Sequence, residues 1–228
     1  RVVKGNGYLY THIERSFNKE YNFFDLKPVG RKTASTFYGF CDFHDTNLFK
    51  EIENVPEITD INSDRHCFLH SYRSFSHTYH KKYEELQLHD SSDPVTISIL
   101  EDIYGKGNLK RAIEPIENAL NDLEEPKRLL DYWVENEIYN GLDYLCFEYP
   151  YAAPISCAAS PSPKYSFSGR VINDYSDPNS MFSYVITTVL SFSNRTVFIL
   201  AVFPNQPNGS IYLDEIDSIK PEILQQKF

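Results

Sequence analysis

The chain has 228 residues, 41% of them apolar and 24% charged, with a formal net charge of −10. A chain of this length buries about 70–75% of its unfolded surface, so it needs neither disulfides nor a metal to form a stable core. The composition excludes a largely disordered protein. The acidic balance makes nucleic acid and anionic membrane surfaces unfavourable partners.

The first third of the chain predicts short strands followed by one helix. Residues 1–40 lack helical periodicity and place glycines between β-favouring stretches such as 8–10 and 36–38, so we expect short strands or an extended arm there. Residues 45–54 have Leu48, Phe49 and Ile52 at helical spacing. Asp45 would cap this helix and Pro56 would end it.

The middle of the chain is expected to be helical. Residues 64–88 carry an apolar stripe at steps of three and four, and Asp64 would cap the helix. A polar connector is expected at 90–108, with a turn at the Gly105-Lys106-Gly107 sequence. Residues 109–140 predict two or three shorter helices, because Pro115 and Pro126 disfavour one continuous helix. The last of them would end at Gly141.

From Leu142 onward the sequence is rich in β-favouring residues. The apolar, β-branched runs 184–190 and 196–203 are separated by a short turn and predict an antiparallel hairpin. A terminal helix is expected at 216–226. We therefore predict an α+β fold, with a helical middle segment and a predominantly antiparallel β-rich C-terminal half. It would form a single domain over 1–228, with a subdivision into 1–141 and 142–228 as the alternative.

Cysteine and histidine spacing suggests a zinc site. Cys41 and His44 have the spacing of half a site in a tight turn at a helix start. His66 and His70 are four residues apart, so their imidazoles lie on successive turns of one helix face. These four residues are our predicted ligands, and zinc is the predicted ion.

The same residues support other interpretations. His66, His70, Arg73, His77 and His80 form one stripe opposite the apolar one, which is also typical of a solvated helix face. With Arg73 among them, the histidines are alternatively a pH-responsive or anion-binding face. Cys41 is alternatively a nucleophile, with a histidine such as His44 as base and Asp45 orienting it.

The segment Gly39-Phe40-Cys41-x2-His44-Asp45-x2-Leu48-Phe49-x2-Ile52-Glu53, followed by Phe68-Leu69-His70-Ser71-Tyr72-Arg73, carries a resemblance. It is similar to a signature of uncharacterised bacterial proteins, over roughly residues 33–75. The resemblance implies a bacterial cytosolic protein and brings no assigned reaction.

Two classes of function remain open. The first is a non-catalytic interaction or regulatory module with a protein partner and a Cys/His zinc site. The second is a metal-dependent hydrolase, because Cys41-x2-His44-x2-Asn47 resembles part of an HNH nuclease finger. Four widely spaced cysteines do not form a disulfide framework, and no apolar run reaches the ~18 residues of a membrane helix. We therefore expect a cytoplasmic protein that does not associate with membranes.

Overall fold

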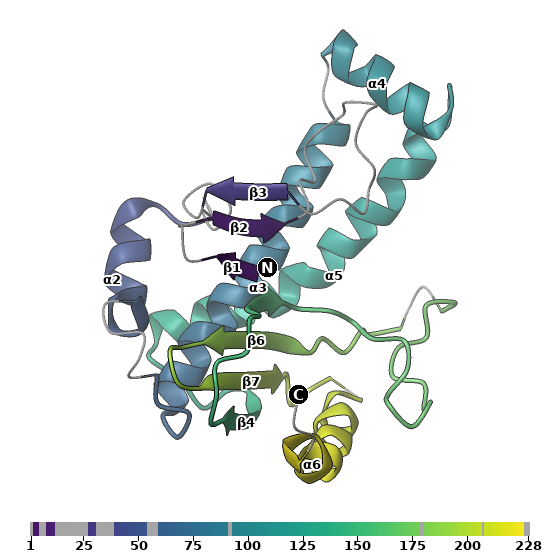
Figure 1. Cartoon of the computed structure of the whole chain (residues 1–228). Coiled ribbons are helices and arrows are strands. Elements are labelled where there is room, and N and C mark those ends of the chain that lie inside the picture. The colour runs from purple at the N-terminus through teal and green to yellow at the C-terminus, as the bar shows by residue number, and fades with distance from the viewer. Residues whose placement is uncertain are drawn as a thin grey trace.

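The structure is a computed structural model that describes residues 2–4, 8–11, 27–30, 39–53, 59–90, 93–177, 180–206 and 208–225. The predicted α+β class is confirmed, with helices in the middle of the chain and an antiparallel sheet in its C-terminal half (Figure 1). The described elements, in chain order, are β1 (Val2–Lys4), β2 (Tyr8–Thr11), β3 (Lys27–Gly30), α2 (Asp42–Glu53), α3 (Asp64–His89), α4 (Pro94–Tyr104), α5 (Leu109–Glu135), β4 (Asp143–Tyr149), β5 (Cys157–Ala159), β6 (Ile186–Ser191), β7 (Thr196–Val202) and α6 (Gly209–Gln225).

The first three strands form a small antiparallel sheet in the order β1-β2-β3. Leu9 of β2 lies opposite Val3 of β1 and Val29 of β3. The strand predicted at 8–10 is therefore confirmed. The strand predicted at 36–38 lies outside the described residues.

The larger sheet has the order β4-β7-β6-β5, and all its neighbouring strands are antiparallel. The predicted hairpin is confirmed as β6 and β7, with Ile186 opposite Ala201 and Ser191 opposite Thr196. Side chains of β7 alternate between the two faces, as the pleat requires. Ala201 joins the core shared with α3 and α5, whereas Leu200 and Val202 pack with the buried face of α6.

Helix α3 runs through the interior of the protein. It contacts α2, α5 and strands β5, β6 and β7. Residues 67–72 and 74–76 are all buried, whereas Asp64 and Arg65 are exposed and His66 and Arg73 are half-buried. The interpretation of the histidine stripe as a solvated face is wrong at His70, because neighbouring elements cover this residue.

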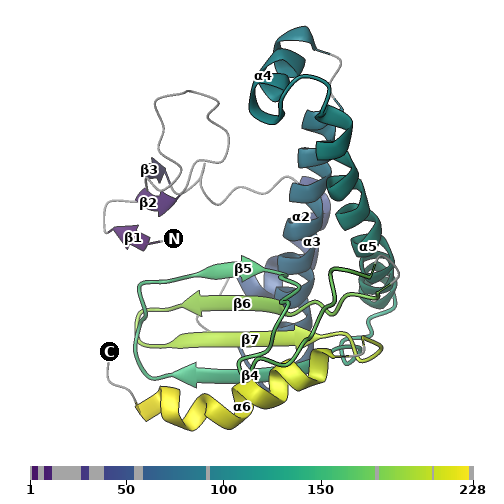
Figure 2. The same ribbon diagram turned by 90° about the vertical axis from the view of Figure 1, so that its right-hand side faces the viewer.

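Beyond Ser76 the helix leaves the core, and its residues become half-buried or exposed up to Leu88. This part of α3 runs beside the first half of α5, and α4 lies at their far end, away from the larger sheet (Figures 1 and 2). We call residues 77–89, α4 and residues 109–122 the helical arm. Leu100 of α4 and Ile116 and Leu120 of α5 are its buried apolar residues.

Helix α5 is continuous, and our prediction of two or three shorter helices is wrong. Pro115 and Pro126 both lie inside it. A proline removes one backbone hydrogen bond, which frees the carbonyl four residues earlier. Those carbonyls belong to Arg111 and Asp122, which are exposed, so water can satisfy them. The helix also ends at Glu135, before Gly141.

Several predicted helix boundaries are corrected. Helix α2 begins at Asp42, so Asp45 is inside its first turn and not its cap; Pro56 lies outside the described residues. The side chain of Ser63, not Asp64, caps α3 by accepting a hydrogen bond from the His66 backbone. The expected connector at 90–108 contains α4, which the Asp93-Pro94 pair starts. Helix α6 begins at Gly209 rather than at 216.

Gly105 and Gly107 have positive φ angles of 87° and 80°, which confirms the predicted turn. Among the described residues, no helix is both long and apolar enough to span a membrane.

Candidate functional site

Acidic side chains of α2 face basic side chains of α3. The Arg73 guanidinium forms an ion pair with Glu53, and its Nη2 lies 3.8 Å from Oδ1 of Asp45. The same guanidinium lies 5.1 Å from the centre of the Phe49 ring. The stripe that contains Arg73 is therefore turned toward α2 at this point, and not toward solvent alone.

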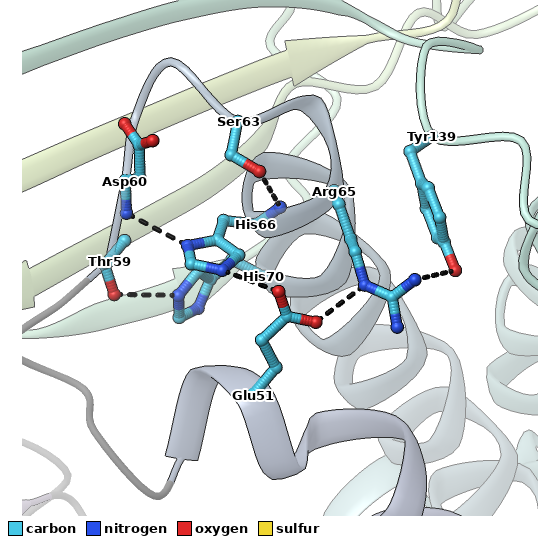
Figure 3. Close-up of polar contacts among 8 residues, drawn as sticks. All are labelled: Glu51, Thr59, Asp60, Ser63, Arg65, His66, His70 and Tyr139. Atoms are coloured by element: carbon cyan, nitrogen blue, oxygen red, sulfur yellow. Dashed lines mark hydrogen bonds and ion pairs between the residues drawn. The ribbon is translucent and has the colours of Figure 1, made fainter.

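About two turns closer to the start of α3, Glu51 binds two adjacent residues (Figure 3). Its Oε2 accepts a hydrogen bond of 2.6 Å from Nε of Arg65, and its Oε1 lies 3.1 Å from Nε2 of His66. Nη1 of Arg65 donates to the hydroxyl of Tyr139 at 2.9 Å, and the guanidinium lies over the Tyr139 ring. We call Glu51, Arg65, His66 and Tyr139 the Glu51 cluster.

Charge and partial burial act in opposite directions on Glu51. Burial raises the pKa of its carboxyl, but the hydrogen bonds from Arg65 and His66 outweigh that effect and lower the pKa. The carboxylate therefore stays ionised at neutral pH. Since its side chain is 44% exposed, water screens the pair and limits its effect on stability.

His66 uses both of its ring nitrogens. The backbone N–H of Asp60 donates to Nδ1 at 3.0 Å, so in the neutral ring the proton lies on Nε2 and is directed at Glu51 (Figure 3). The ring thus joins the 59–63 segment to α2. In this arrangement neither nitrogen is available to a metal ion or to a substrate without breaking a hydrogen bond.

His70 is buried one turn further along, with 7% of its surface exposed. Its Nε2 lies 3.3 Å from the hydroxyl of Thr59, whose backbone carbonyl accepts a hydrogen bond of 3.0 Å from Arg195. Burial, together with the nearby His66 and the positive charge of Arg73, lowers the pKa of His70 to about 4. The ring is therefore neutral at pH 7.

Cys41 and His44 form a separate pair at the start of α2. The Cys41 sulfur lies 3.2 Å from Nδ1 of His44, and both residues are exposed. Asp45, predicted to orient the histidine, forms its ion pair with Arg73 instead. The thiol and imidazole are close enough for proton transfer, without the third member of a catalytic triad among the described residues.

The structure thus distributes the four predicted zinc ligands among three sets of contacts. Cys41 contacts His44, His66 contacts Glu51 and Asp60, and His70 contacts Thr59. Within the part of the chain that the structure describes, no group of three or more His, Cys, Asp or Glu side chains is arranged to hold a metal ion. The four-ligand zinc site stays a prediction from the sequence.

Glu51, Arg65 and Tyr139 were not among the site residues predicted from the sequence. Glu51 and Tyr139 contact Arg65 from positions 14 and 74 residues away in the chain. No local spacing relates residues so far apart. The available signal was the acidic face of α2 opposite a basic stripe, which indicates pairing only after the two helices are known to pack together.

Comparison of the chain with protein-family models, with curated proteins and with solved structures finds no match in any of the three. The resemblance of residues 33–75 to uncharacterised bacterial proteins therefore stays an expectation.

Proposed function

We propose that this chain is a non-catalytic interaction or regulatory module of the bacterial cytosol, and that it binds a protein partner through the end of the helical arm. The observation that carries the proposal is the exposure of large apolar side chains there. Val95 and Ile103 of α4 are 67% and 57% exposed, and Tyr104 of α4 and Tyr83 and Leu88 of the α3 part of the arm are also exposed. Burying apolar area contributes about 25 cal/mol per Å², so a protein that covered these side chains would gain affinity.

Helix α4, at the end of the arm, has a capped start, a defined end and a contact with α3. The Asp93 side chain caps α4 by accepting from the Thr96 backbone at 2.8 Å, and Gly105 ends the helix. The Tyr104 hydroxyl lies 3.0 Å from Nε2 of the buried His89, which ties α4 to the last turn of α3. Because the helix is capped and Tyr104 holds its last turn to α3, the backbone of α4 has little entropy to lose on binding.

Charge bears on the choice of partner. Each copy of the chain has a net charge of −10, so a second copy would be repelled at long range. We therefore expect a different protein, with an apolar groove for α4 and a neutral or basic surround.

Site-specific photocrosslinking tests the proposal. A photoreactive phenylalanine placed at Val95 or Ile103 in the full chain should give a discrete adduct with another protein in bacterial cells. The matched control position is Met181, which is 55% exposed but lies outside the arm. The substitution Ile103→Glu should reduce the Val95 adduct at least tenfold. Equal adducts from Met181, an adduct with a second copy alone, or none from either arm position would contradict the proposal.

A metal-dependent hydrolase, most concretely an HNH-like nuclease, is the second candidate. The 3.2 Å contact between Cys41 and His44 favours it, because it keeps two ligand types together at a helix start. Assays for nucleic-acid cleavage with Mg²⁺, Mn²⁺ and Zn²⁺ test this candidate. Cleavage that is lost in His44→Gln would support it, and intact nucleic acid with every metal would exclude the nuclease.

A further inference from the structure

Two cysteines that are distant in the sequence meet between α3 and the larger sheet. Cys67 lies in the first turn of α3, and Cys146 lies in β4, opposite Ile199 of β7. Their sulfur atoms are 3.5 Å apart, which is van der Waals contact. We propose that Cys67 and Cys146 are an oxidation site, at which a hydroperoxide converts the two thiols into a reversible disulfide that ties α3 to β4.

The surroundings hold the two thiols together. Cys67 is 2% exposed and packs with Val197 and Ile199, and its sulfur lies 3.5 Å from the carbonyl oxygen of Ile61. Cys146 is only partly buried. A disulfide needs a sulfur–sulfur distance of about 2.0 Å, so closure requires a movement of roughly 1.5 Å.

The pair also has distinct chemical roles. The hydrogen bond from the Cys67 thiol lowers the pKa of Cys146, while that hydrogen bond and burial raise the pKa of Cys67. Cys146 is therefore both the more accessible thiol and the better source of thiolate, which is the nucleophilic form. Cys67 is placed to react second.

The reaction balances with a hydroperoxide as the oxidant. The Cys146 thiolate attacks one peroxide oxygen, so that a sulfur–oxygen bond forms, the oxygen–oxygen bond breaks, and the leaving oxygen takes a proton to become an alcohol or water. The Cys67 sulfur then attacks the sulfenic sulfur of Cys146. The sulfur–sulfur bond forms, hydroxide leaves, and it takes the Cys67 proton as water. The two thiols lose two electrons in total, and the peroxide gains them.

Such a disulfide would join elements that are about 80 residues apart in the chain. It would fix the first turn of α3, next to His66 of the Glu51 cluster, to an edge strand of the sheet. Disulfides that form in the cytosol are usually transient and redox-sensing, which fits a reversible link of this kind.

The experiment uses the full chain with Cys41→Ser and Cys157→Ser, because both of these cysteines are exposed and would react on their own. Treatment with hydrogen peroxide should remove both remaining thiols, leave a monomer two hydrogens lighter, and produce a linked peptide pair containing residues 67 and 146. Dithiothreitol should reverse the change. The oxidised protein should melt about 5–10 °C higher, because the link constrains the unfolded chain.

Single-thiol variants in the same background separate the two roles. With Cys67→Ser, Cys146 should accumulate sulfenic acid that dimedone traps. With Cys146→Ser, Cys67 should stay reduced, because peroxide does not reach it. The proposal is overturned if the two-cysteine chain gains oxygen instead of losing hydrogen, forms linked dimers, or keeps both thiols under peroxide that oxidises the Cys67→Ser variant.

Discussion

The imidazole of His70 and the hydroxyl of Thr59 lie 3.3 Å apart in the interior, where α3 packs against the larger sheet. The contact joins the buried half of α3 to the segment that precedes the helix. Next to it, the Thr188 hydroxyl lies 2.6 Å from that of Ser74 and donates at 3.4 Å to the backbone carbonyl of His70. A neutral His70 fits among these groups, whereas a charged one would lose much of its hydration.

Acid should therefore destabilise the protein through His70. The folded pKa is lowered to about 4, below the value of about 6.5 in the unfolded chain, so the unfolded chain binds more protons between these values. The contribution of neutral His70 to the free energy of unfolding is fully present above pH 6.5 and is lost as the pH falls toward 4. We expect the free energy of unfolding to drop by about 2 kcal/mol from pH 7.5 to 5, measured by urea denaturation.

His70→Gln should remove most of that pH dependence, because glutamine does not titrate and can still bond to Thr59. His80→Gln is the matched control, since His80 lies on the same helix, half-buried, 3.4 Å from Glu84. If His70→Gln keeps the full slope between pH 7.5 and 5, burial of His70 is not the source of the acid sensitivity.

Gly141 should not tolerate a side chain. A Cβ atom built there would lie 2.6 Å from the indole of Trp133, which stacks on Phe203 in the core. Gly141→Ala should lower the free energy of unfolding by about 1–3 kcal/mol and shift the fluorescence of the single tryptophan. Gly30→Ala is the control, because no atom of the described residues lies within 4 Å of its Cβ position. Similar losses in both variants would show that crowding against Trp133 is not the cause.

Removing a proline from α5 should stabilise the protein. Pro115 is exposed in the helix interior, and alanine there would restore a hydrogen bond to the carbonyl of Arg111. Pro115→Ala should raise the free energy of unfolding by about 1 kcal/mol or more. Pro94→Ala should have little effect, since Pro94 is at the first position of α4, where no hydrogen bond is missing. A lower free energy of unfolding in Pro115→Ala would show that proline does not destabilise α5 at this position.

The parts of the fold that were predicted correctly have local causes. The β6–β7 hairpin follows from two adjacent β-branched runs and a short turn, and α3 follows from periodicity within one segment. Most errors arose where solvent or residues distant in the sequence determine the local structure. The residues whose carbonyls the α5 prolines free, Arg111 and Asp122, are exposed, which spacing alone does not reveal. The omission of α4 had another cause, because its Asp93-Pro94 start signal is local.

The candidate site was less predictable for a related reason. Helical spacing correctly placed His66, His70 and Arg73 on neighbouring turns of α3. Spacing carries no information about what covers that face. Asp45, Glu51 and Glu53 of α2 cover it at Arg65, His66 and Arg73, and the Thr59 segment covers it at His70. The difference between a solvated stripe and a buried neutral histidine is thus set by tertiary packing.

The zinc site predicted from Cys41, His44, His66 and His70 has a direct test. If these four residues hold one ion, protein produced with zinc in the medium should contain about one zinc per chain by elemental analysis. Cys41→Ser and His66→Gln should each abolish binding. His77→Gln is the control, because His77 lies on the same helix but outside the predicted set.

Binding would also change the Glu51 cluster. Zinc on His66 would have to displace either the Asp60 N–H from Nδ1 or Glu51 from Nε2. Protons compete with zinc for these nitrogens, so zinc affinity should fall as the pH is lowered. Zinc that persists in His66→Gln but is lost in both Cys41→Ser and His44→Gln would assign the ion to the Cys41–His44 pair alone. No zinc in the unsubstituted chain at neutral pH would contradict the predicted zinc site. His66 would then only link α2 to the start of α3.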